Sequence, residues 1–146
     1  MPPDDDPELV QAVVVIDNNP ITLTACEQIL TRVGYRVGLS GDGSSGLAQA
    51  AHLHPVAAVV DLNMPGMDGL EVITRLRAGD DTMAIVAITG YPTLERAVGA
   101  LKQGADDFLS KPFSPGQLRR SVEGALATRR TRTRGQRAAR AAKESP

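Results

Sequence analysis

Short apolar runs recur along the chain at roughly even intervals, and segments with helical periodicity separate them. The runs that suit buried strands are Val13–Ile16, Arg36–Leu39, Val56–Val60, Ala84–Ile88 and Phe108–Leu109. Mostly apolar runs of this length are typical of strands in a parallel sheet that is covered on both faces. The alternation of strand and helix repeats five times, which predicts an α/β fold.

The segments between these runs carry helix start and stop signals such as proline in a first turn and glycine after a last one. Helices are expected from Pro20 until Gly34 stops the first, from about Ser44 to Leu53, after Gly69 as far as the AGDD segment, after Pro92 as far as Gly104, and after Ser114-Pro115. Five such units in 146 residues favour an open, doubly wound, five-stranded parallel sheet over a barrel, which needs about 250 residues. Right-handed crossovers would place helices on both faces.

Composition limits the class of protein but does not determine its function. No apolar run is long enough to cross a membrane and the opening MPPDDDPELV is acidic, so we expect a cytoplasmic protein without a membrane segment. The single cysteine, Cys26, falls among apolar helical positions and is expected to be an inert core thiol. Residues 1–128 hold 9 basic and 16 acidic side chains, whereas residues 129–146 hold 7 and 1. We therefore expect an acidic arm at 1–9, one domain at 10–128 and a basic tail at 129–146.

Polar side chains stand where the predicted strands end. Strand one runs into Asp17-Asn18, strand three into Asp61, strand four into Thr89 and strand five into Lys111. The carboxyl ends of parallel strands share one edge of a sheet, and ligands of open α/β sheets bind there. The sequence therefore predicts that two carboxylates, an amide, a hydroxyl and an ammonium converge at this edge.

This set of groups suits phosphoryl transfer assisted by a divalent cation. Oxygens of Asp17, Asn18 and Asp61, with a backbone carbonyl from the loop that follows, suit a hard cation such as Mg²⁺. A carboxylate can attack phosphorus, and the protein then mostly positions groups and neutralises charge. We expect Asp61 to accept the phosphoryl group, with Lys111 and Thr89 hydrogen-bonding to it.

The motifs VVVIDNN, VVDLNMPGMDG, AITG and FLSKPF occur in an order and spacing that resemble the receiver domains of two-component response regulators, of the chemotaxis-regulator-like, stand-alone kind. The resemblance covers about residues 10–127. It implies a flavodoxin-like (βα)5 fold with strand order 2-1-3-4-5. It also implies Mg²⁺ or Mn²⁺ as cofactor, and a histidine kinase or phosphotransfer protein as phosphoryl donor.

The resemblance assigns a role to each matching residue. Asp61 matches the phosphorylated aspartate, Asp17 an acid that reaches the metal through water, and Lys111 the lysine that pairs with the acceptor. Thr89 matches the switch hydroxyl and Phe108 the aromatic whose rotamer follows it. The remaining matches are the Asn63 backbone carbonyl as metal ligand, the Asn63 side chain and Tyr91 as groups that tune phosphoryl lifetime, and a Lys111-Pro112 bond that is often cis.

One position departs from the family pattern. The family usually has a second acid after Asp17, and this chain has Asn18, an amide that could also cap the first helix. We therefore expect weaker metal binding than in relatives with both acids. The rival hypothesis is a phosphorylation-independent pseudo-receiver that acts as an interaction module.

Two other classes are disfavoured by single features. An aspartyl phosphatase would need an acid two residues after Asp61, where the chain has Asn63, and a flavin-binding domain would need a phosphate loop after strand one. We do not expect an enzyme beyond self-catalysed phosphorylation and dephosphorylation.

The basic tail has no aromatic residue for base stacking, so nucleic acid is not an expected partner. It could extend the fifth helix as far as Gly135 and then fray, or contact an acidic partner. We expect the output to pass to a separate target protein, because few residues remain after 127. A homodimer through the face of the fourth helix is left open.

Overall fold

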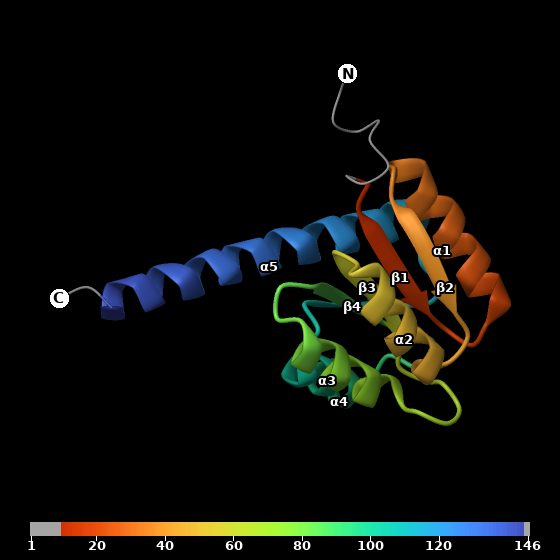
Figure 1. Cartoon of the computed structure of the whole chain (residues 1–146). Helices are drawn as coiled ribbons and strands as arrows, with labels where there is room; N and C mark the ends of the chain where they lie inside the picture. The colour runs from red at the N-terminus through yellow and green to blue at the C-terminus, as the bar shows by residue number, and fades with distance from the viewer. Residues whose placement is uncertain (1–9, 145–146) are drawn as a thin grey trace, which may run out of the picture.

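The computed structural model describes residues 10–144, with side chains at residues 10–132, 134 and 135. The expected acidic arm at residues 1–9 lies outside the described residues. Strands and helices alternate five times (Figure 1). The elements are β1 (Ala12–Ile16), α1 (Pro20–Val33), β2 (Arg36–Ser40), α2 (Gly43–Leu53), β3 (Ala57–Asp61), α3 (Gly69–Gly79), β4 (Ala84–Thr89), α4 (Leu94–Gln103), β5 (Asp107–Ser110) and α5 (Pro115–Glu144).

The five strands form one parallel sheet with the order β2-β1-β3-β4-β5. The predicted doubly wound α/β fold and its strand order are therefore confirmed. In the register, Ile16 pairs with Val60 and Asp61 pairs with Ile88. These pairings bring the ends of β1, β3 and β4 to the same level at one edge of the sheet, the carboxyl edge.

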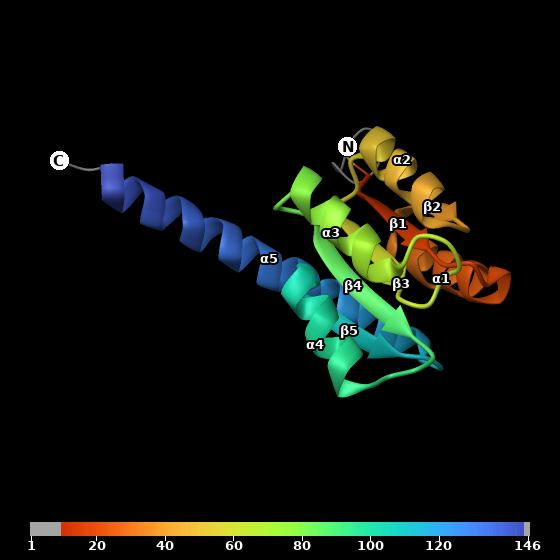
Figure 2. The same cartoon turned by 90° about the horizontal axis from the view of Figure 1, so that it is seen from below.

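Apolar side chains cover both faces of the sheet, as the near-continuous runs predict. One core packs beneath α2, α3 and α4 and includes Val60 and Ile73. The other packs beneath α1 and α5 and includes Val59 and Leu118. Figure 2 shows the two groups of helices on opposite sides of the strands. Strand residues alternate between the two cores because successive side chains of a strand point to opposite faces.

Local capping explains where the helices around the carboxyl edge begin. Asn19, not Asn18, caps α1, since its side chain accepts a hydrogen bond from the Ile21 N–H at 2.9 Å. Asp68 caps α3 through the Leu70 N–H at 3.0 Å. Caps of this kind satisfy N–H groups that a helix start leaves without partners. Asn18 therefore does not serve as the cap of α1.

Helix α5 continues beyond the expected end at Gly135 and reaches Glu144. That expectation is wrong because glycine costs only about 1 kcal/mol in a helix, and alanine, arginine, glutamine and lysine on either side favour helix. The division expected between residues 128 and 129 falls inside α5. Figures 1 and 2 show the last turns of α5 extending away from the sheet.

Cys26 is buried in the core beneath α1, as predicted. Burial and, to a smaller extent, the nearby charge of Asp17 raise the pKa of its thiol to about 12, although Lys111 opposes the shift. The thiol is therefore protonated at neutral pH, which fits an inert core residue. In residues 10–144, no helix is long and apolar enough to cross a membrane.

Candidate functional site

The carboxyl edge brings together the charged residues that end β1, β3 and the segment after β5. The Lys111 ammonium lies 2.7 Å from Asp17 Oδ2 and 3.7 Å from Asp61 Oδ2. The Lys111-Pro112 peptide bond is cis. The predicted convergence of these three residues is therefore present, although Lys111 forms its closer contact with Asp17 and not with Asp61.

Both carboxylates are removed from water while the lysine is partly exposed. Asp17 is fully buried and Asp61 is 3% exposed. Burial raises the pKa of the Asp61 carboxyl above its usual range, and the neighbouring Asp17 adds to the rise. The Asn63 N–H, which donates to Asp61 Oδ1 at 3.1 Å, and the Lys111 ammonium lower that pKa and offset part of the shift. The two carboxylates thus share the ammonium group of Lys111 in a poorly hydrated site.

Thr89 lies at the end of β4, one residue beyond the residue that pairs with Asp61. Its buried hydroxyl oxygen accepts hydrogen bonds from two groups, the Asn63 side-chain amide and the Tyr91 backbone N–H, the latter at 3.0 Å. The side chain of Tyr91 is 74% exposed. Asn63 and Tyr91, which the resemblance connects with phosphoryl lifetime, therefore both contact Thr89, the first through its side chain and the second through its backbone N–H.

An open hollow of about 550 Å³ lies above Asp61. Its lining residues are Asn18, Asn19, Asp61, Asn63, Gly90, Tyr91 and Lys111. In the described part of the chain, no group of three or more His, Cys, Asp and Glu side chains is placed to hold a metal ion. Mg²⁺, however, usually takes only one or two carboxylates and keeps several waters. The donor set of two carboxylates, the exposed amide of Asn18 and backbone oxygens therefore fits such a cation.

Two residues that sequence reasoning missed shape this loop. A Cβ at Gly69 would collide with the Asp61 carbonyl oxygen and with Leu62 Cα, so the start of α3 packs directly on the end of β3. Arg96, in the first turn of α4, donates to the Leu62 carbonyl at 2.7 Å and to Asn63 Oδ1 at 3.3 Å. The GMDG segment signals a turn, but no pattern near Arg96 signals its contact.

Phe108 lies in β5 and is half-buried against the core beneath α2, α3 and α4. It is therefore on the α4 side of the sheet, apart from the carboxylates.

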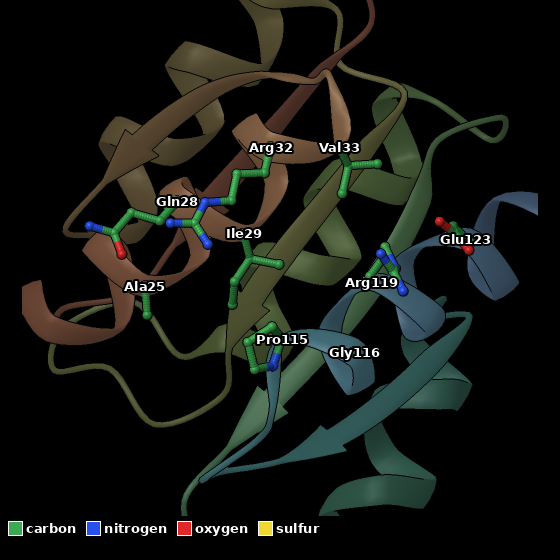
Figure 3. A pocket seen from close by; sticks show the side chains of 9 residues that line it. All are labelled: Ala25, Gln28, Ile29, Arg32, Val33, Pro115, Gly116, Arg119 and Glu123. Atoms are coloured by element: carbon green, nitrogen blue, oxygen red, sulfur yellow. The ribbon is translucent and has the colours of Figure 1, made fainter.

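A second hollow, of about 700 Å³, lies between α1 and the start of α5. Figure 3 shows that Gln28, Ile29 and Arg32 line it from α1, and Arg119 and Glu123 from α5. None of the strand-end residues lines this hollow, so it is separate from the site at the carboxyl edge.

Comparison with known proteins identifies the class. The family described as the response regulator receiver domain matches residues 13–123, and the chain belongs to this family. Membership implies phosphoacceptor signalling in a two-component system. The family is one of Mg²⁺-binding signalling domains and not of classical enzymes.

The relatives include regulators longer than this chain and a receiver domain protein of similar length. Transcriptional regulatory protein PrrA of Mycobacterium tuberculosis is 35% identical over 117 residues, which are 80% of this chain and 50% of that protein. The chain thus spans about half the length of the curated relatives it matches. A CheY-like receiver domain protein from Methanospirillum hungatei JF-1 has a TM-score of 0.79 and 27% identity, covering 84% of this chain and 98% of that one.

One similar structure carries the chemistry that the site suggests. It is a response regulator protein from Burkholderia pseudomallei with a phosphorylated aspartic acid, a calcium ion and citrate. Its TM-score is 0.74 and its identity 26%, with 84% of this chain and 72% of that chain covered.

Proposed function

We propose that this chain is the phosphoacceptor of a two-component phosphorelay and that Asp61 receives the phosphoryl group. The observation that carries the proposal is the Lys111 ammonium held between two buried carboxylates, of which Asp61 faces an open hollow. The similar protein from Burkholderia pseudomallei with a phosphorylated aspartic acid and a calcium ion supports it. The donor is a histidine kinase or a phosphotransfer protein.

In the transfer step, a carboxylate oxygen of Asp61 attacks the phosphorus of a phosphohistidine. The new P–O bond forms as the P–N bond breaks, and the electron pair stays on the imidazole nitrogen, which takes up a proton. Lys111 neutralises part of the charge on the transferred group, and Thr89 donates a hydrogen bond to it. Positioning and charge neutralisation are the main contributions that a protein makes to such a reaction.

Asp17, Asn18, Asp61 and the Asn63 backbone carbonyl would hold Mg²⁺ or Mn²⁺. The bound cation supplies charge neutralisation for the phosphoryl oxygens. Asn18 contributes a neutral oxygen where a second acid would contribute a charge, so we expect weaker metal binding than in relatives with both acids.

The phosphoryl group then biases a two-state switch. Its charge draws Thr89 and Lys111 toward Asp61, Phe108 repacks, and the surface formed by α4, β5 and α5 changes its affinity for a partner protein. Three apolar side chains of α4, Leu94, Val98 and Leu101, are exposed and available for such contacts, or for a homodimer.

One observation favours a second candidate function. With Asn18 in place of an acid, the site has only two carboxylates for a cation, and a phosphorylation-independent interaction module would tolerate that loss. The retained Asp61, Thr89 and Lys111 favour the phosphoacceptor.

The test is incubation with acetyl phosphate and Mg²⁺, followed by intact mass on the wild type and on Asp61→Asn. We expect the wild type to gain one phosphoryl group and Asp61→Asn to gain none. A folded wild type that gains nothing at high Mg²⁺, and nothing from a cognate kinase, supports the interaction module instead.

A further inference from the structure

Arg96 is joined to the loop after Asp61 by three contacts, although it lies on a different helix. Its guanidinium donates to the Leu62 carbonyl at 2.7 Å and to Asn63 Oδ1 at 3.3 Å, and it lies 3.5 Å from Asp68 Oδ1. The side chain of Arg96 is 27% exposed, so much of it is shielded from water. These contacts tie the first turn of α4 to the segment that positions the acceptor.

The contact with Asn63 fixes the orientation of an amide. A guanidinium has donors and no acceptor, so the group of Asn63 that faces Arg96 must be its oxygen. The nitrogen of the same amide then faces Thr89 and donates to its hydroxyl oxygen. Arg96 therefore determines whether the oxygen or the nitrogen of the Asn63 amide faces Thr89.

The orientation of that amide determines what the Thr89 hydroxyl can do. A hydroxyl has two acceptor sites and one hydrogen. The Asn63 amide nitrogen and the Tyr91 N–H fill the two acceptor sites of Thr89, and no acceptor in the described part of the chain receives its hydrogen. The hydroxyl is thereby left as a donor. A reversed amide would present its oxygen to Thr89 and would take up that hydrogen.

We propose that Arg96 is a positioning residue for phosphorylation: by holding the Asn63 amide oxygen, it keeps the Thr89 hydroxyl available to donate to the incoming phosphoryl group. The inference rests on the proposed phosphoacceptor function of Asp61. The same contacts connect α4 to Thr89, so the helix that carries the exposed apolar side chains senses the state of that hydroxyl.

The first experiment measures the rate of phosphoryl gain from acetyl phosphate at saturating Mg²⁺. Arg96→Ala is expected to lower the rate about tenfold, because a donor that is no longer oriented loses most of its contribution. Arg96→Lys keeps a donor within reach of Asn63 and is expected to recover most of the loss. Arg75→Ala removes an exposed arginine whose ion pair with Glu71 lies on α3, and it should match the wild type.

A double-mutant comparison separates positioning from a structural role. If Arg96 acts through Thr89, then Arg96→Ala should have no further effect on the rate in a Thr89→Ala background. An equal loss in both backgrounds, or no loss in the single variant, overturns the inference while leaving the phosphoacceptor function intact.

A second readout needs no phosphoryl group and decides the inference even if the wild type is not phosphorylated. The side-chain amide signals of Asn63 in a ¹⁵N-labelled sample can be assigned by their loss in Asn63→Ser. We expect these signals to shift in Arg96→Ala and to stay unchanged in Arg75→Ala. Unchanged signals in Arg96→Ala would show that Arg96 does not orient the amide.

Discussion

Two clusters of buried charge lie at opposite edges of the sheet, and their charge balances are opposite. In the carboxyl-edge cluster, Asp17 and Asp61 share Lys111, so two negative charges face one positive charge. In the amino-edge cluster, Arg77 and Arg129 hold Asp106, so two positive charges face one negative charge.

The two clusters also differ in how many hydrogen bonds the carboxylates of Asp106 and Asp61 accept. Asp106 Oδ1 accepts from Arg129 at 2.7 Å, and Oδ2 accepts from Arg77 at 3.1 Å and from the Ile85 N–H at 2.9 Å. Asp61 accepts from the Asn63 N–H at 3.1 Å, and Lys111 lies farther away at 3.7 Å. A fully bonded carboxylate fixes structure, whereas one with spare acceptor capacity can still react.

The amino-edge cluster thus acts as a clasp. It joins α3, which carries Arg77, to the start of β5 and to Arg129 of α5. Beyond Arg129, the last turns of α5 extend away from the sheet (Figure 1). Similar groups therefore serve stability where their hydrogen bonds are complete and chemistry where they are not.

The largest expected effect comes from breaking the clasp. Asp106→Asn keeps the volume of the side chain but removes the charge between Arg77 and Arg129. We expect the free energy of unfolding to fall by about 3–5 kcal/mol, as for other buried ion pairs that lose one partner. Urea unfolding at neutral pH measures this change.

The matched variant at the other edge is Asp17→Asn. It removes one of two like charges and leaves Lys111 with Asp61, so we expect the free energy of unfolding to fall by less than it does for Asp106→Asn. If the two variants lost equal stability, the distinction between a bonded clasp and an unsaturated site would not hold.

An effect smaller than that of Asp106→Asn is expected from Gly69→Ala. The added methyl group would meet the Asp61 carbonyl oxygen and Leu62 Cα, which are backbone atoms that cannot move aside easily. We expect the free energy of unfolding to fall by about 1–3 kcal/mol, and the phosphorylation rate to fall as the Asp61 loop shifts. Gly79→Ala is the control, because a methyl group at that end of α3 meets nothing within 4 Å. The control should be neutral or stabilise by up to about 1 kcal/mol; a Gly69→Ala protein as stable as Gly79→Ala would contradict the tight packing.

The sequence predicted most of the fold and the main groups of the site. Apolar runs located every strand to within one residue at each end, because burial on both faces leaves a strong signal. The strand-end rule also predicted that Asp17, Asp61 and Lys111 meet, since parallel strands bring their carboxyl ends to one edge.

The contacts that the sequence did not predict are those that helix side chains make with distant loops. Arg96 lies 33 residues from Asn63 in the chain, and Arg77 lies 29 residues from Asp106. Both pairs depend on how a helix packs against a neighbouring loop, and an arginine on a helix surface carries no periodic signal for such a partner. The continuation of α5 through Gly135 was not predicted, because glycine is a local helix stop signal and the effect of the helix-favouring residues around it is larger.

The last prediction concerns Asn18, the neutral residue beside the carboxyl-edge cluster. Asn18→Asp adds a third carboxylate beside the hollow while Lys111 stays the same. We expect the affinity for Mg²⁺ to rise about tenfold at low ionic strength, equivalent to 1.4 kcal/mol. Calorimetric titration with MgCl₂ measures the change. Gln103→Glu adds the same charge at the end of α4 and should leave the affinity unchanged.

The stability of the same variant without metal tests the charge balance of the carboxyl-edge cluster. With EDTA present, three carboxylates repel one another around one lysine, so Asn18→Asp should unfold more easily than the wild type. Added Mg²⁺ should reverse that order, because a ligand that binds only the folded state stabilises it. If the wild type binds no Mg²⁺ and Asn18→Asp does, Asn18 has disabled the metal site, and the phosphorylation-independent module becomes the better account of this chain. If both bind, the neutral oxygen of Asn18 only lowers the affinity for Mg²⁺, and the carboxyl edge remains a site for phosphoryl transfer.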